Sequence, residues 1–203
     1  MKLIQISQNT DEWLEFRKGK ITGSKLKDIV SLRGKNKIGY YQLIADRLAI
    51  EPDLEDPRER GHRLEEEAIE RFSKESKKEV EIGLTCVSDF NPNIMVSPDG
   101  LIGKDDIYHE AVEIKCLSDA RHIEAVLSET YPDAYHFQIL QYFIVIETLQ
   151  KLSLVFYTDR IPSADYKVFE VTREELLPLI ETYKEMEEKY LREIDEIVTK
   201  LAF

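Results

Sequence analysis

Residues Met95–Leu117 have the sequence MVSPDGLIGKDDIYHEAVEIKCL, in which two apolar runs flank a polar break. The first run ends at SPDG, where proline and glycine favour a bend beside Asp99. Side chains alternate along the second run, so Glu113 and Lys115 share one face while apolar residues fill the other. The sequence therefore predicts that Asp99, Glu113 and Lys115 lie near one point.

Two carboxylates and a lysine are suited to metal-assisted hydrolysis. Carboxylate oxygens are ligands that Mg²⁺ or Mn²⁺ prefers, and a lysine can orient or deprotonate a water molecule. The Glu-x-Lys pattern is unspecific, because it recurs at Glu75–Lys77 and Glu187–Lys189 in polar, helix-like surroundings. The residues alone leave a metal site and a surface hairpin as alternatives.

The composition is typical of a globular protein. The chain has 203 residues, enough to bury a sizeable core within one domain. It shows no membrane-length apolar run and no signal-peptide core at its start, so we expect a cytoplasmic protein without membrane contact. The two cysteines are too few for an iron–sulfur cluster and are expected to be reduced.

The charge distribution points to a local basic surface. The net charge of −12 argues at first against a nucleic-acid partner. Between Arg17 and Lys37, however, the chain has eight basic residues and one acidic residue, so this stretch carries a net charge of +7. Such a stretch is a candidate nucleic-acid surface, with an ordinary solvated helix face as the alternative.

The hydrophobic pattern predicts one α/β domain over residues 1–203, with a central mixed β-sheet flanked by helices. We expect Trp13, Leu14 and Phe16 to form the buried side of the first helix, and Thr172 with Glu175 to cap the last one. Helices are expected at 11–18, from Ser24 to about 30, 40–50, 58–76, 120–127, 134–146 and 172–200. Strands are expected at 80–87, 94–97, 111–115, 151–157 and 166–171.

Five short motifs follow one another along the chain: Arg17 with Ile21–Ser24, Gly61–Glu65, Ser97–Gly100, Glu113–Lys115, and Gln138. In order and spacing they resemble the phage lambda exonuclease/YqaJ viral recombinase family of the PD-(D/E)xK nucleases. The resemblance covers roughly Trp13 to Ile146. It implies a restriction-endonuclease-like core.

The resemblance also assigns metal ligands. Asp99 and Glu113 would hold Mg²⁺ (Mn²⁺ is possible), in two sites, with the Ile114 carbonyl as a further ligand. Glu65 would reach the ions from the long helix, although the helix pattern alone describes an exposed glutamate. Lys115 would position or activate the attacking water.

A glutamine completes the implied catalytic set. Gln138 would hydrogen-bond to the attacking water or to the lysine; a plain polar residue on a buried helix is the alternative. The family often has two glutamines separated by one residue, whereas this chain has Gln138 and Gln141, so both are candidates.

Three further residues match family positions that grip a 5′-terminal phosphate: Arg17, Ser24 and Ser97. A guanidinium fork with hydroxyl donors suits a phosphate monoester. A helix N-cap for Ser24 and a turn residue for Ser97 are the alternatives. Arg33 would lie near the entering duplex.

The resemblance implies a DNA exonuclease that acts 5′→3′ on duplex ends and leaves 3′ single strands for recombination. It further implies a homotrimeric ring and a single-strand annealing protein as partner, in the host cytoplasm if the chain is phage-encoded. The alternatives are a related nuclease of other polarity or single-strand specificity, such as the CRISPR adaptation or RecB-like groups, a catalytically silent DNA-end binding module, and an unrelated acidic interaction domain.

Overall fold

The computed structural model describes residues 4–30, 36–50, 56–105 and 107–202. The chain forms two compact units. Unit 1 comprises Met1–Leu64, Lys115–Glu129 and Phe156–Lys167, and unit 2 comprises Glu65–Ile114, Thr130–Val155 and Val168–Phe203. Because the segments of the two units alternate along the chain, the expectation of a single domain over 1–203 stays a prediction.

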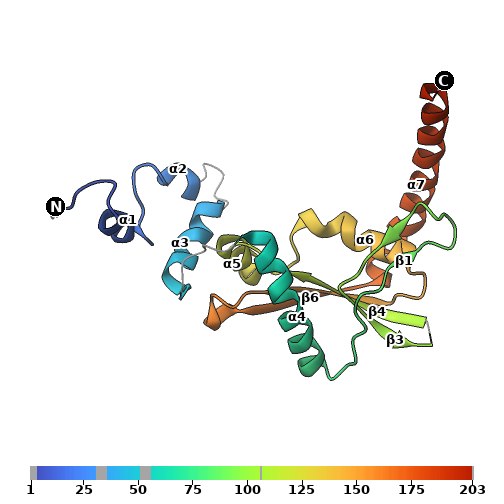
Figure 1. Ribbon diagram of the computed structural model, residues 1–203, viewed down its shortest axis with the longest axis horizontal. Helices are drawn as coiled ribbons and strands as arrows, with labels where there is room; N and C mark the ends of the chain where they lie inside the picture. The colour runs from blue at the N-terminus through green and yellow to red at the C-terminus, as the bar shows by residue number, and fades with distance from the viewer. Residues whose placement is uncertain (1–3, 31–35, 51–55, 106, 203) are drawn as a thin grey trace. The chain divides into compact units, whose positions relative to one another are not determined.

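A four-stranded sheet has the order β3-β4-β5-β6 (Figure 1). A second, two-stranded sheet pairs β1 antiparallel with β2. In the larger sheet β3 and β4 form an antiparallel hairpin, in which Gly100 is opposite Val112. The strands are β1 (Cys86–Val87), β2 (Met95–Val96), β3 (Gly100–Lys104), β4 (Ile107–Lys115), β5 (Lys151–Tyr157) and β6 (Tyr166–Thr172).

Strand β3 corrects the sequence-based expectation of a loop after Asp99. Its glycines serve close packing within the hairpin rather than ending it. A Cβ at Gly100 would lie 2.3 Å from a side-chain carbon of Val80, and one at Gly103 only 2.1 Å from the Ile107 carbonyl oxygen. Two strand limits were also wrong, because β1 begins at Cys86 rather than Val80 and β4 begins at Ile107 rather than Ala111.

The helices agree with the sequence pattern to within a few residues. Thr172 and Glu175 form the expected capping box at the start of α7, and this helix continues through Pro178. A 3₁₀ turn, η1 (Asp133–Tyr135), precedes α6, and a second, η2 (Pro162–Ala164), precedes β6. The helices are α1 (Asp11–Arg17), α2 (Leu26–Ile29), α3 (Ile38–Leu48), α4 (Pro57–Ser76), α5 (Asp119–Leu127), α6 (His136–Val145) and α7 (Arg173–Leu201).

The expected buried side of α1 is wrong. Thr10 caps this helix, since its side chain accepts a hydrogen bond from the Trp13 N–H, but no residue of α1 is buried. Leu14 is 57% exposed and Phe16 is 39% exposed. Trp13 is half-buried, so this short helix covers only part of the apolar side that was predicted.

The core of unit 2 is built by α6 and β5. Six of the ten residues of α6 are buried. Neighbouring positions on β5, such as Leu154 and Val155, are fully buried, so both faces of this strand are covered, as expected for an inner strand. In unit 1 the buried cluster of Ala45, Ile123 and Ile161 packs α3 against α5.

Within the described ranges, none of the helices has both the length and the apolar character needed to cross a membrane.

Unit 1 contains a buried ion pair between Arg160 and Asp119. Arg160 donates from Nε to Asp119 Oδ1 at 2.9 Å and from Nη2 to Asp119 Oδ2 at 2.5 Å. Asp119 is 6% exposed and Arg160 is 9% exposed. Nearby, Arg60 donates to the Leu117 carbonyl and to the Thr158 hydroxyl. Such fork-shaped pairs fix geometry, because either charge left alone in the interior is costly.

Asp119→Asn should therefore lower the free energy of unfolding by about 3–5 kcal/mol, since it removes the negative charge that Arg160 binds in the interior. Urea denaturation measures the change. Glu193→Gln is the matched control, because it removes the acid of the exposed Lys189–Glu193 pair and should change stability by less than about 0.5 kcal/mol. Equal effects of the two substitutions would contradict the importance of the buried pair.

Candidate active site

Asp99 lies between β2 and β3 and points toward β4. Its Oδ2 accepts a hydrogen bond from the backbone N–H of Ile114 at 2.6 Å. The hairpin register explains this contact, because Gly100 is paired with Val112 and the preceding residue therefore meets the end of β4. The expected neighbourhood of Asp99 and the Glu113–Lys115 segment is thus present in the structure.

Glu113 is a buried carboxylate on β4, with 6% of its surface exposed. Gln138 Nε2 donates to its Oε1 at 2.6 Å, and the Tyr142 hydroxyl donates to its Oε2. The Tyr142 hydroxyl also lies 3.4 Å from the Ser97 carbonyl oxygen. A surface hairpin would leave Glu113 in water, so that alternative is wrong.

Three carboxylates meet at this place. Burial raises the pKa of Asp99 to about 7, together with the negative charge of Glu113 and the charge and hydrogen bond of Glu65, against the opposing effect of the Ile114 N–H. Glu65, on α4, is half-buried rather than exposed. Like charges this close can be relieved by a proton or by a cation.

The donor set fits a divalent metal ion in its chemistry. Carboxylate oxygens are hard ligands of the kind that Mg²⁺ and Mn²⁺ prefer. As the side chains stand, no three Asp, Glu, His or Cys residues in the described part of the chain form a ready metal-binding group. Gln138 and Tyr142 already donate to both oxygens of Glu113.

Lys115 is the last residue of β4 and is half-buried. It follows Glu113 by two residues, so strand alternation gives the two side chains the same face. The Ile114 N–H is held by Asp99, which fixes the backbone between them.

The structure distinguishes the two candidate glutamines. Gln138 contacts Glu113, whereas Gln141 hydrogen-bonds to Glu187 on α7. Positions three residues apart on a helix differ by about 60° in direction, which is enough for the two side chains to reach different neighbours. Gln138 is therefore the one of these two glutamines that donates to Glu113.

Tyr142 is a residue that the sequence analysis missed. It is 2% exposed, and burial with the nearby charge of Glu113 raises its pKa, so its hydroxyl stays protonated and donates. The available signal was the spacing of Gln138 and Tyr142, since residues four apart lie on one face of a helix.

A second group of expected residues gathers in unit 1. Arg17 Nη2 lies 3.3 Å from both Thr22 Oγ1 and Ser24 Oγ, and its guanidinium lies 4.1 Å from the centre of the Trp13 ring. Ser24 is not a helix N-cap, because Lys25 occupies that position of α2 without a side-chain bond. Contacts of Thr22 and Trp13 with Arg17 were not predicted. Both residues hold the Arg17 guanidinium in place.

Ser97 belongs to unit 2, and its hydroxyl lies 3.2 Å from that of Thr85. Its exposed position directly after β2 is compatible with the turn-residue alternative. Arg33 lies outside the described residues.

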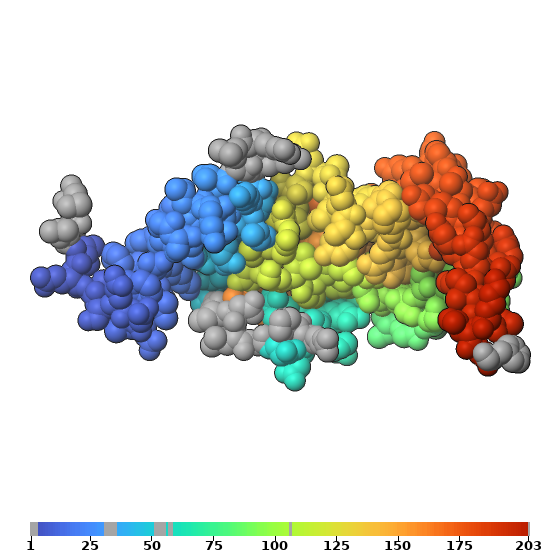
Figure 2. All heavy atoms as spheres, turned by 90° about the horizontal axis from the view of Figure 1, so that it is seen from above, coloured from blue at the N-terminus to red at the C-terminus, as the bar shows by residue number. Residues whose placement is uncertain are grey.

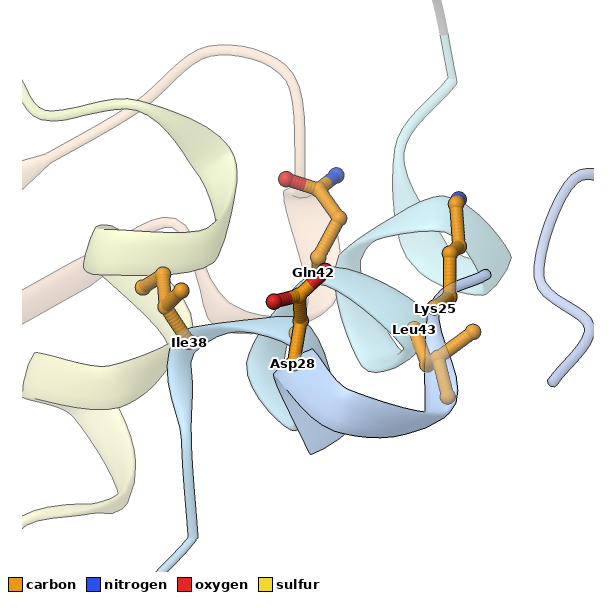
Figure 3. A pocket seen from close by; sticks show the side chains of 6 residues that line it. Lys25, Asp28, Ile38, Gln42 and Leu43 are labelled. Atoms are coloured by element: carbon orange, nitrogen blue, oxygen red, sulfur yellow. The ribbon is translucent and has the colours of Figure 1, made fainter. Parts of the chain in front are cut away.

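The basic stretch of unit 1 also borders a pocket of about 240 Å³ (Figure 3). The pocket is lined by Lys25, Asp28, Ile38, Gly39, Gln42 and Leu43, and Lys25 directly follows Ser24 in the chain. Asp46 connects this region to α1: it accepts hydrogen bonds from Gln42 Nε2 and from the Gly19 N–H and lies 3.9 Å from Lys25. The segment that carries Arg17 is therefore anchored on α3.

Known proteins provide independent comparisons. A family model described as the YqaJ-like viral recombinase domain matches residues 12–150. The crystal structure of an alkaline exonuclease (LHK-Exo) from Laribacter hongkongensis is 26% identical, and the match covers 95% of this chain and 98% of that one, with a TM-score of 0.62. The structure of LHK-Exo in complex with dAMP gives the same identity and coverage and a TM-score of 0.60. No curated protein matches the chain.

The likeness to these structures settles the fold class. They have the restriction-endonuclease-like fold, and nearly the whole chain aligns with them. The expected α/β class, with a central mixed sheet flanked by helices and a restriction-endonuclease-like core, is confirmed.

The carboxylate cluster predicts an unusual titration. In metal-free buffer the Asp99 carboxyl should titrate near pH 7, about three units above an ordinary aspartate. Because the folded-state pKa is raised, this group destabilises the folded protein as the pH rises from about 4 to about 7. Carbon-13 NMR of the aspartate carboxyl carbons measures the midpoint.

Glu113→Gln is the matched control for this titration. It removes a charge that raises the pKa of Asp99, so the midpoint should fall, and added Mg²⁺ should lower it in the parent protein because a cation favours the carboxylate. A midpoint near 4 in the parent protein would contradict both the burial of Asp99 and its interaction with the other two carboxylates.

Proposed function

The chain belongs to the YqaJ-like viral recombinase domain family, and on this premise we propose that it is a metal-dependent DNA exonuclease. The family match and the likeness to an alkaline exonuclease support hydrolysis of DNA from its ends. The resemblance found in the sequence is thereby confirmed at the level of the family. The observation that carries the proposal is the cluster of Glu65, Asp99 and Glu113 in unit 2.

This cluster favours an enzyme over a silent binding module. Burying Glu113 and crowding it with two further carboxylates is unfavourable unless a cation or proton compensates. A protein that only binds DNA ends has no need for such a group beside a phosphate. An unrelated acidic interaction domain is disfavoured by the family match.

Nucleases of this kind generally use divalent metal ions, and we propose Mg²⁺, with Mn²⁺ as a substitute and two ions as the expected number. Asp99, Glu113, Glu65 and the Ile114 carbonyl would hold them. The ions would supply positive charge to the scissile phosphate and acidify the attacking water. Lys115 would orient that water or accept its proton.

Gln138 and Tyr142 would keep Glu113 in place during the reaction. Their hydrogen bonds fix both carboxylate oxygens. A carboxylate held by two donors loses rotational freedom before the substrate arrives, so less free energy is spent on ordering it in the transition state.

The group in unit 1 would recognise the end of the strand. Arg17, with Thr22 and Ser24, offers a guanidinium and two hydroxyls, which suits a 5′-terminal phosphate monoester. We propose that Ser97 and Arg33 contribute to DNA binding as well. This group favours 5′→3′ digestion of duplex ends over the other polarity, which remains the second candidate.

The partners follow from the same family. We propose a homotrimeric ring around DNA and cooperation with a single-strand annealing protein in recombination. A closed ring would keep the enzyme on its substrate through many cycles.

Digestion of a linear duplex with one labelled strand tests the proposal. The protein should remove nucleotides from 5′-phosphorylated ends in Mg²⁺ and not in EDTA. Lys115→Ala should slow the reaction about 10²- to 10⁴-fold, the range for loss of a group that moves a proton. Release of label from 3′ ends would leave a nuclease of the other polarity, and no cleavage in Mg²⁺ or Mn²⁺ would refute the enzyme.

Arg17→Ala should reduce the preference for a 5′-phosphate over a 5′-hydroxyl about 10-fold, because a charged hydrogen bond to the phosphate is lost. Lys27→Ala is the matched control from the same basic stretch. Loss of the Lys27 charge should weaken binding of 5′-phosphorylated and 5′-hydroxyl duplexes equally, since a surface charge attracts the whole duplex. An unchanged preference in Arg17→Ala would remove the end-recognition assignment.

The two glutamines offer a further test. Gln138→Ala and Tyr142→Phe should each lower kcat about 10-fold with little change in KM, because they position a group needed in the transition state. Gln141→Ala should keep the parental kcat, since this side chain contacts Glu187 instead. Steady-state kinetics on a short duplex distinguishes them, and equal losses at both glutamines would contradict the assignment.

A further inference from the structure

An aromatic cluster surrounds the residue before Gln138. Phe137 is 63% exposed. Its ring meets His136 edge-on, with centroids 5.5 Å apart, and lies 5.6 Å from the ring of Tyr183 on α7. Tyr131 is parallel to His136 at 6.4 Å, and its hydroxyl lies 3.0 Å from His136 Nδ1. Tyr131, His136, Phe137 and Tyr183 together are named the aromatic platform.

The side chains of α6 form two neighbouring rows that contact different parts of unit 2. One row, Gln138 and Tyr142, points to Glu113. The next row, Phe137 and Gln141, meets α7, where Gln141 contacts Glu187. At that level Glu187 Oε2 is fully buried. One turn earlier on α6, Phe137 contacts Tyr183 of α7 and still remains largely exposed.

The charge around the aromatic platform disfavours a phosphate there. Burial raises the pKa of Tyr131, and the negative charges of Glu175 and Asp133 raise it further. A phosphate would be repelled by these acids, whereas an uncharged ring would not. The surface thus suits an aromatic, neutral ligand.

We propose that the aromatic platform stacks an unpaired nucleobase of the DNA strand held at the active site. The proposal rests on the nuclease function inferred above. Base–aromatic stacking is sequence-tolerant, because every base has a π-face, and an exonuclease must process every sequence. Covering Phe137 with a base also removes exposed apolar surface from water.

The location adds a reason for an unpaired base rather than a paired one. Gln138 donates to Glu113, and Phe137 is the preceding residue of the same helix, so we expect a base stacked on Phe137 to belong to a nucleotide near the candidate active site. Inside a duplex both faces of a base are covered by its neighbours, and a terminal pair offers only its outer face, so any other base must leave the stack before a side chain can cover it. The aromatic platform would therefore hold the strand end open.

Binding experiments with the full chain in EDTA, where no cleavage occurs, test the proposal. The probes are a 5′-phosphorylated duplex with mismatched terminal nucleotides and the same duplex with abasic sites at those positions. Phe137→Ala should weaken binding of the mismatched duplex about 10-fold and leave the abasic duplex unchanged, since only the former offers a base to stack. Phe137→Trp should restore the affinity.

Tyr190→Ala is the matched control, because Tyr190 is 52% exposed on a distant turn of α7. It should bind both probes as the parent does. An equal loss on both probes, or no loss on either, would overturn the stacking proposal, and the same holds if Phe137→Trp fails to restore binding. If Phe137→Ala shows the base-dependent loss of binding but the parent protein never cleaves DNA, the nuclease function is refuted and the stacking site is retained.

Discussion

The burial of Glu113 in the middle of a sheet is the constraint on which the rest of unit 2 depends. An isolated carboxylate in the interior costs several kcal/mol, so it persists only with donors on both oxygens. Gln138 and Tyr142 provide them, and both come from α6. The position of α6 on the sheet is therefore a requirement of the site and not only of the apolar core.

The rest of unit 2 holds α6 at both ends. At its N-terminal end Gln138 is bound to Glu113, and at its C-terminal end Arg173 donates to the carbonyls of Phe143 and Ile146, at 2.7 and 2.8 Å. These are carbonyls that a helix end leaves without partners, and a cation there also opposes the helix dipole. Because Arg173 is the first residue of α7, the capping of α7 and the placement of α6 are coupled. Six buried residues between the two ends supply the apolar energy.

Much of this could be predicted from the sequence, because the information was local. The alternation in β4 and the bend at Asp99 brought the two carboxylates together, and the capping box marked the start of α7. The sequence could not show that Gly100 belongs to a strand, since that depends on its pairing with Val112, and the Val80 side chain that leaves no room for a Cβ there is twenty residues away. It could not separate Gln138 from Gln141 either, because their partners lie on different elements. The apolar side chains of α1 misled for a related reason: periodicity reports which residues could be buried, and not whether a partner surface exists.

The three carboxylates explain why an acidic site can serve a nucleic-acid enzyme. Burial and the neighbouring carboxylates raise the pKa of Asp99 to about 7, so below that pH a proton competes with any cation for the same oxygens. Binding of a divalent ion would then release the proton and turn three repelling acids into one ligand set, with the sign of the local field reversed toward phosphate. The free energy stored in the repulsion is recovered when the ion binds. The repulsion among the three carboxylates that lowers the stability of the metal-free protein would therefore increase the affinity of the site for a divalent cation.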